Sequence, residues 1–193
     1  MTARARFCLA CGGHLVIVRE QGRRRRRCRR CGWTFYDNPV PAAVAVIVSG
    51  GRLLMARRGR PPYAGSWDLP GGFLEAGEVP EAGLRRELRE ELGVRARPVR
   101  LIGFATDRYG PRGFPVLTTV YRVALGRGDV RPGDDVSEVR WFPRRTVPFG
   151  AVAFPSMRRL CAATSRVRLL SGVGDPPEAG DPSQGQVTRG SGV

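Results

Sequence analysis

The sequence lacks a hydrophobic run long enough to cross a membrane. Its longest apolar stretch covers residues 39–48, whereas a membrane-spanning helix needs about 20 apolar residues. The N-terminal region also lacks the pattern of a signal peptide, because the apolar segment 15–18 is brief and Arg19 ends it. We therefore expect neither a transmembrane nor a secreted protein, and we take a cytoplasmic location as the default expectation.

Lysine is absent as well, and all 33 basic residues are arginine. The exclusive use of arginine indicates a compositional bias of the genome as much as a functional requirement. The net charge of +16 is therefore only weak evidence for function. The charge still attracts polyanions, among which nucleotides and nucleic acids are the obvious candidates. Hydrophobic residues make up 41% of the chain, which excludes wholesale disorder.

Four of the five cysteines form two close pairs, each with two residues between its members: Cys8 and Cys11, then Cys28 and Cys31. A tight turn with this spacing presents two thiolates to one tetrahedral ion, and a hairpin brings the second pair opposite the first. A reducing cytosol argues against disulfides. We therefore predict a structural Zn²⁺ site whose four sulfur ligands leave no position for a substrate. Cys161 stands alone and is expected to be a buried apolar residue.

A run of arginines lies between the two cysteine pairs, at positions 23–27, 29 and 30. The run has two interpretations. It is either a nucleic-acid patch or a solvated hairpin tip that compensates the net negative charge of four thiolates around one zinc ion. No aromatic residue is interleaved with the arginines between residues 8 and 32 to stack on bases. We therefore favour charge compensation.

Residues 80–93 give the clearest helix prediction. Pro80 and Glu81 suit the first turn, and Gly93 is a natural stop. At about 100° per residue, three sets of side chains separate around the axis: leucines (Leu84, Leu88, Leu92), glutamates (Glu87, Glu90, Glu91) and arginines (Arg85, Arg86, Arg89). Like charges repel at this spacing. The convergent carboxylates therefore predict a divalent cation that prefers oxygen ligands, Mg²⁺ or Mn²⁺.

A longer pattern contains this helix. Every fixed position of G-x5-E-x7-R-E-U-x-E-E-x-G-U, with U aliphatic, is matched, by Gly72, Glu78, Arg86, Glu87, Glu90, Glu91 and Gly93. In this pattern the chain resembles the Nudix family, and residues 67–71 are similar to the usual lead-in. A looser resemblance extends from about residue 41 to residue 160. It implies an α/β (α+β) fold, an α/β/α sandwich around a mixed sheet.

The resemblance also implies roles for single residues. Nudix enzymes hydrolyse a nucleoside diphosphate linked to another moiety, X. The family's metal ligands correspond to the carbonyl of Gly71 and the carboxylates of Glu87, Glu90 and Glu91. The expected catalytic residues are Glu87, which corresponds to a position sometimes assigned as general base, Glu91, and Arg86, which orients the glutamates; Glu78 is largely structural. A further acid often comes from a later loop, and among Asp134, Asp135 and Glu138 we choose Asp135.

The identity of X is less well defined. A four-cysteine ribbon before the domain resembles NADH pyrophosphatases and related zinc-ribbon Nudix proteins that act on ADP-ribose or FAD, so we expect hydrolysis of ADP-ribose, NADH or FAD with release of AMP. The NADH-type motif S-Q-P-W-P-F-P-x-S is matched only at Pro111, Phe114 and Pro115. Trp67, Arg112 and Phe114 are candidate substrate contacts, with core packing and an ordinary hairpin turn as the alternatives.

We expect three segments: a zinc ribbon over 1–38, a Nudix domain over 39–170 and a disordered tail over 171–193. The tail is rich in Gly, Pro and Ser and has no periodicity. The expected partner is a nucleotide-type small molecule, with nucleic acid less favoured, no membrane, and a homodimer suggested by the resemblance. Two other functions stay open, a house-cleaning pyrophosphatase for nucleoside triphosphates and a nucleotide-sensing regulator that binds nucleic acid.

Overall fold

The protein is described here from a computed structural model that covers residues 5–111 and 113–166, without the side chains of 163–166. Arg112 and the tail expected over 171–193 lie outside the described residues. Within the described ranges, no helix is both long and apolar enough to span a bilayer.

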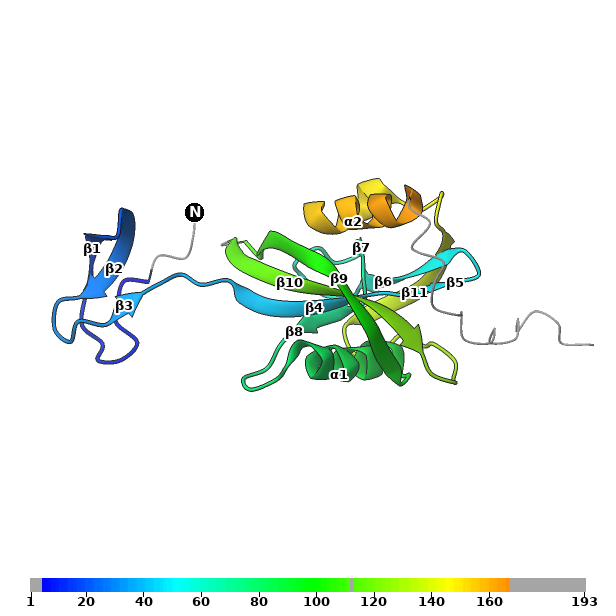
Figure 1. Ribbon diagram of the computed structural model, residues 1–193, viewed down its shortest axis with the longest axis horizontal. Coiled ribbons are helices and arrows are strands. Elements are labelled where there is room, and N and C mark those ends of the chain that lie inside the picture. Colours follow the sequence, from blue (N-terminus) through cyan, green and yellow to red (C-terminus); the bar gives the residue numbers. More distant parts are fainter. Residues whose placement is uncertain (1–4, 112, 167–193) are drawn as a thin grey trace, which may run out of the picture.

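The N-terminal segment forms a three-stranded antiparallel sheet in the order β1-β2-β3, made of β1 (Leu15–Glu20), β2 (Arg23–Cys28) and β3 (Thr34–Phe35). Figure 1 shows it beside the main body, joined by the segment that leads into β4 (Val40–Val46). Residues 23–27 of the arginine run lie in strand β2 and not at the expected hairpin tip, whereas Arg29 and Arg30 lie in the turn that follows. The tip is formed instead by Gln21 and Gly22, whose positive φ angles of 49° and 75° suit a two-residue hairpin turn.

The main body contains a mixed sheet and a second, antiparallel sheet. The mixed sheet has the order β8-β4-β10-β9, with β8 (Gly71–Phe73), β9 (Ala96–Tyr109) and β10 (Phe114–Leu125), and β10 runs parallel to β4. The second sheet has the order β11-β6-β5, with β5 (Val48–Ser49), β6 (Arg52–Arg58) and β11 (Val136–Pro143), and β7 (Trp67–Asp68) pairs with β6.

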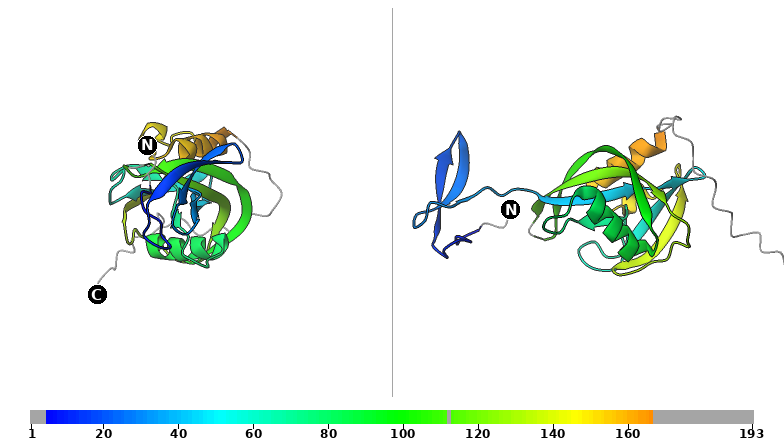
Figure 2. Two further views of the ribbon diagram at one scale, coloured as in Figure 1. Left: turned by 90° about the vertical axis from the view of Figure 1, so that its left-hand side faces the viewer. Right: turned by 60° about the horizontal axis from the view of Figure 1, so that its bottom comes forward.

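Two helices lie on opposite sides of these strands, as Figures 1 and 2 show. They are α1 (Pro80–Leu92) and α2 (Pro155–Arg166), with a short 3-10 helix η1 (Phe149–Ala151) before α2. The arrangement confirms the predicted α+β fold with a mixed sheet. As predicted, α1 ends at Gly93, whose φ of 69° lets its N–H return to the carbonyl of Arg89 at 3.1 Å.

The core is divided between the two helices. The predicted stripe of Leu84, Leu88 and Leu92 is completely buried and packs in one cluster with residues of β4, β6 and β10. A second cluster includes Met157 and Cys161 of α2, so the lone cysteine is the buried apolar residue that was expected. Burying a leucine side chain contributes up to about 1.5–3 kcal/mol, which anchors α1 and fixes the direction of its remaining faces.

Candidate active site and metal sites

Glu91 lies at the inner end of the candidate active site. It is only 9% exposed, and its Oε2 accepts a hydrogen bond from the backbone N–H of Gly71 at 2.8 Å. Burial raises the pKa of Glu91 well above its ordinary value, and the charges of Glu87, Asp135 and Asp68 raise it further. A carboxylate in such surroundings carries its negative charge readily only when a cation is nearby.

Two glycines of β8 let the strand approach the glutamates. Gly71 has a φ of 131°, and a Cβ there would lie 2.3 Å from the carbonyl oxygen of Ala43. A Cβ on Gly72 would lie 2.6 Å from the carboxylate of Glu87. The first position thus excludes a side chain by backbone contact, whereas the second keeps open the space that Glu87 occupies.

Arg86 joins the loop before α1 to the helix itself. Its Nε and Nη2 donate to both carboxylate oxygens of Glu78 at 2.9 and 3.0 Å, and Nη1 donates to Glu87 at 2.8 Å and Glu90 at 3.1 Å. Nη2 also reaches the carbonyl of Phe73 at 3.1 Å. The helical wheel placed Arg86 on a third side with Arg85 and Arg89. That placement was wrong, because the long side chain folds back among the acids.

Glu87 is half-buried between Arg86 and the other carboxylates. Burial raises its pKa, the hydrogen bond and charge of Arg86 lower it, and the charges of Glu90 and Asp135 raise it again. Glu90 is more exposed, with 43% of its side chain accessible. The predicted glutamates therefore form a gradient from buried Glu91 to exposed Glu90, with Arg86 bonded to Glu87 and Glu90.

The loop before β11 brings Asp135 toward these glutamates. Gly133 N–H donates to the carbonyl of Glu91 at 2.9 Å, and a Cβ on Gly133 would lie 2.5 Å from the carbonyl oxygen of Glu90. The loop thus packs on the last turn of α1, and the charge of Asp135 contributes to the raised pKa of Glu87 and of Glu91.

The other two candidate acids lie in different surroundings. Asp134 forms an ion pair with Arg60 at 3.8 Å, and Glu138 pairs with Arg57 at 3.4 Å. Glu138 also pairs with Arg140. Both acids therefore form ion pairs with arginines. Of the three candidates, Asp135 is the one whose charge contributes to the raised pKa values of Glu87 and Glu91.

Asp68 is a buried acid that sequence reasoning missed. It is 9% exposed, and burial raises its pKa to about 7, against the lowering effect of Arg58, whose Nη1 lies 3.6 Å away. Its charge also acts on Glu91 and is influenced by Asp107. The only signal in the sequence was its place in the lead-in to the box, next to Trp67 and three residues before Gly71.

The three candidate substrate contacts have different outcomes. Trp67 is 7% exposed and packs in the core, with its ring edge-to-face against Phe142. Phe114 begins β10 after a tight turn and meets the rings of Tyr109 at 5.4 Å and Phe73 at 6.0 Å. Arg112 lies outside the described residues. An aromatic cluster that includes Phe114 therefore adjoins β8, and Trp67 contributes no open surface to it.

The four predicted cysteines converge. Their sulfurs all lie within 4.8 Å of one another. The backbone N–H of Ala10 donates to Sγ of Cys8 at 3.4 Å, and that of Arg30 donates to Sγ of Cys28 at 3.3 Å. Backbone N–H groups, chiefly that of Cys31, lower the pKa of Cys28 to about 7. Tetrahedral sulfur ligands stabilised by amide hydrogens are the chemistry that zinc prefers.

The carboxylates are arranged more loosely than the cysteines. Among the described residues, only the cysteine cluster brings three or more metal-binding side chains within 4.8 Å of one another. Mg²⁺ tolerates a looser protein site, because it keeps several waters and takes oxygens from substrate phosphates. The donor set of hard oxygens, in which Glu87 and Glu91 have raised pKa values, fits such a cation, and the cysteines fit zinc.

Comparisons with known proteins agree with this geometry. The family model described as "NUDIX domain" matches residues 38–160. An ADP-ribose pyrophosphatase from Methanocaldococcus jannaschii is 31% identical over 117 residues, which cover 60% of this chain and 69% of the relative. An NAD-capped RNA hydrolase NudC from Chromobacterium violaceum is 32% identical over 169 residues, which cover 86% of this chain but 60% of the relative.

The solved structures give the same result. A NUDIX hydrolase from Nitrosomonas europaea has a TM-score of 0.64 and 28% sequence identity, and the match covers 80% of this chain and 86% of that one. The NudC relatives are longer proteins, of which this chain spans 60% or less.

Proposed function

Because this chain belongs to the Nudix family of hydrolases, we propose that it cleaves the pyrophosphate bond of a nucleoside diphosphate linked to another moiety. One observation carries the proposal. Glu91 accepts a hydrogen bond from the backbone of Gly71, and the charge of Asp135 acts on Glu87 and Glu91, whose pKa values are raised. Repulsion between these carboxylates raises the free energy of the protein without a cation. Binding of a divalent cation together with an anionic substrate offsets this repulsion.

The residues that would hold Mg²⁺ or Mn²⁺ are Glu87, Glu90, Glu91 and Asp135, together with the carbonyl of Gly71. The cation, when bound, neutralises the charge of the pyrophosphate and lowers the pKa of water at the site. Buried Glu91 fixes the inner end of the site through its bond to the Gly71 N–H. Exposed Glu90 lies at the solvent side, where substrate enters.

Glu87 is the residue we assign as general base. It accepts the proton of the water that attacks one phosphorus, and the phosphate-bearing fragment then leaves. Arg86 donates a hydrogen bond to Oε1 of Glu87 at 2.8 Å, which restricts the orientation of this carboxylate. Glu78 accepts two hydrogen bonds from the opposite side of the Arg86 guanidinium. This bidentate contact restricts the guanidinium to one orientation.

Substrates in which AMP is linked through a pyrophosphate to another moiety, such as ADP-ribose, NADH or FAD, are the class that we favour. The relatives named ADP-ribose pyrophosphatase and NAD-capped RNA hydrolase act on molecules of this kind by their names. The rings of Phe73, Tyr109 and Phe114 adjoin Gly72, and an aromatic cluster is suited to hold a base or nicotinamide ring. We assign Phe114 to this contact and leave Trp67 to the core.

The domain division follows from the same residues. We propose a zinc ribbon over 1–38, in which Cys8, Cys11, Cys28 and Cys31 hold structural Zn²⁺, and a catalytic domain over 39–170. The convergence of the four sulfurs supports the first assignment. The two apolar clusters of the main body, which contain no residue of the N-terminal sheet, support the second.

The test is product analysis with Mg²⁺ or Mn²⁺ against ADP-ribose, NADH, NAD, FAD, diadenosine polyphosphates and nucleoside triphosphates. Release of AMP from ADP-ribose or from one of the dinucleotides supports the proposed class and identifies X. Pyrophosphate released only from triphosphates would leave the site chemistry intact and replace the substrate class. If folded, zinc-loaded protein cleaves none of them, the proposed activity is wrong.

A further inference from the structure

The strand β2 presents arginines on both faces of the N-terminal sheet. Neighbouring residues of a strand point to opposite faces, and alternate ones are about 6.6 Å apart. The pairing with β1 and β3 places Arg25 and Arg27 on one face with Val16, Val18 and Thr34. Within the described part of the chain, none of the arginines from 19 to 30 forms an ion pair with a carboxylate. Their charges are thus available to an anionic partner.

Aromatic side chains gather beside Arg25 and Arg27. The guanidinium of Arg25 lies 4.6 Å from the ring centroid of Tyr36 and donates to the Tyr36 carbonyl at 3.3 Å. Arg27 Nε donates to the carbonyl of Gly32 at 3.1 Å. The sequence showed no aromatic residue within the arginine run, but the fold brings the aromatics that follow the run back against it. Stacking surfaces and cationic groups therefore adjoin in space.

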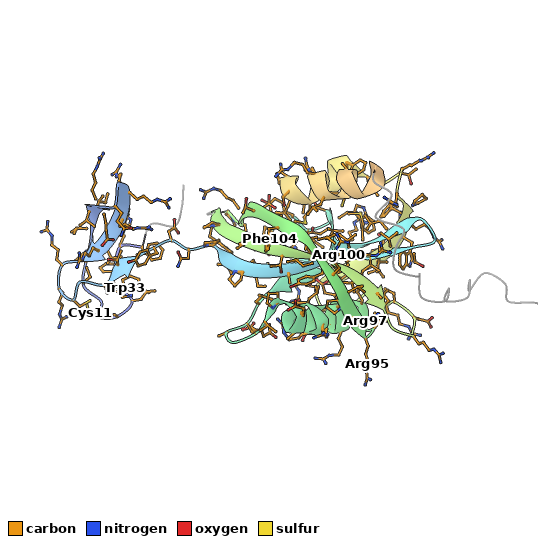
Figure 3. The ribbon with its side chains drawn as sticks, in the orientation of Figure 1. Cys11, Trp33, Arg95, Arg97, Arg100 and Phe104 are labelled. Carbon is orange, nitrogen blue, oxygen red and sulfur yellow. The ribbon has the colours of Figure 1, made fainter. Side chains whose placement is uncertain are left out.

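Arg27 and Tyr36 border a groove of about 650 Å³ beside the N-terminal sheet, and Trp33 and Phe35 also line it. Figure 3 shows Trp33 within this part of the molecule. Tyr36 is 52% exposed, so its ring has surface available for a further contact. Glu20 also lines the groove, and its Oε2 is buried without a hydrogen-bond partner.

We propose that the surface formed by Arg25, Arg27 and Tyr36, together with the groove that Arg27 and Tyr36 line, binds single-stranded nucleic acid. The arginines contact phosphates, and the exposed ring of Tyr36 stacks on a base. A featureless polyanion fits less well, because the carboxylates of Glu20 and Asp37 in the groove repel it. The site is separate from the catalytic carboxylates and does not depend on hydrolysis.

The first test is the fluorescence anisotropy of a labelled single-stranded RNA of about 12 nucleotides, titrated with the full zinc-loaded chain in several salt concentrations without Mg²⁺. The double substitution Arg25→Gln/Arg27→Gln should weaken binding at least about tenfold. It should also reduce the slope of log affinity against log salt by about 1.4, since each phosphate contact on a single strand contributes about 0.7.

The matched control is Arg19→Gln/Arg24→Gln. These two arginines are exposed and pair across β1 and β2 on the opposite face of the same sheet, so the control removes the same charge. Binding should change less than about threefold. Equal weakening by both double variants would overturn the proposal, because net charge alone would then explain binding. Absence of binding by the unmodified chain at about 50 mM salt would overturn it as well.

A second variant separates stacking from charge and serves if the arginine variant loses zinc. Tyr36→Leu keeps every charge and removes one exposed ring, and it should weaken RNA binding about tenfold. Inorganic polyphosphate of matched charge should compete poorly with the RNA. If polyphosphate competes equally well, or if Tyr36→Leu binds RNA like the unmodified chain, the face is a general anion surface and the proposal fails.

Discussion

Replacement of Arg86 by alanine should lower the free energy of unfolding of the main body, and the contacts of Arg86 allow the size of this decrease to be estimated. The side chain is 24% exposed, and its loss leaves Glu87, itself 19% exposed, without its ion pair and the carbonyl of Phe73 without a donor. Removing one partner of a buried pair costs about 3–5 kcal/mol. Because Arg86 retains some contact with water, we take about 2 kcal/mol for the variant.

This free energy corresponds to a measurable change in melting temperature. For a body of about 130 residues, an unfolding entropy of about 2.1 cal/mol/K per residue converts it to a decrease of about 7 °C. Scanning calorimetry of zinc-loaded protein without added Mg²⁺ should show this decrease for Arg86→Ala. Arg85→Ala, on the exposed side of the same helix, should change the melting temperature by less than about 2 °C. Equal melting temperatures for the two variants would refute the clamp described for Arg86.

Three further predictions use the same structure. Gly71→Ala should destabilise the protein more than Gly72→Ala, because its Cβ meets backbone at 2.3 Å whereas the Gly72 Cβ meets the movable carboxylate of Glu87; denaturant unfolding of both would show the opposite order if this reasoning is wrong. Cys28→Ser should abolish one equivalent of bound zinc and Cys161→Ser should keep it, as metal analysis would show, since only Cys28 lies in the sulfur cluster. Arg86 lowers the pKa of Glu78 to about 2, so its stabilisation is complete above about pH 4.5 and is lost as the pH falls toward 2; the stability difference between the unmodified chain and Glu78→Gln should shrink over this interval, and a constant difference would contradict the assignment.

Local patterns predicted α1 well because a helix depends on neighbours three and four residues apart. The buried leucines and the stop at Gly93 both followed from that spacing. The cysteine cluster also followed from spacing, since zinc ligands occur as short turns.

Contacts between distant segments were harder to predict. The arginine run became a strand because β1 and β3 pair with it, and Trp67 became a core residue because Phe142 of β11 packs on it. Asp68 was missed because its raised pKa depends on burial by the whole body, which no local pattern reveals. Asp135 was one of three acids until the packing of Gly133 on α1 distinguished it.

The most direct test of the central claim is the rate of hydrolysis of the best dinucleotide substrate by Glu91→Gln, measured beside Glu81→Gln. Both changes remove a carboxylate from α1, but Glu91 faces Gly71 whereas Glu81 accepts a hydrogen bond from Tyr121 at 2.7 Å. We expect Glu91→Gln to be at least about 100-fold slower with Mg²⁺ or Mn²⁺, and Glu81→Gln to stay within about threefold of the unmodified chain. A fully active, well-folded Glu91→Gln protein would contradict the assignment of these carboxylates to the reaction.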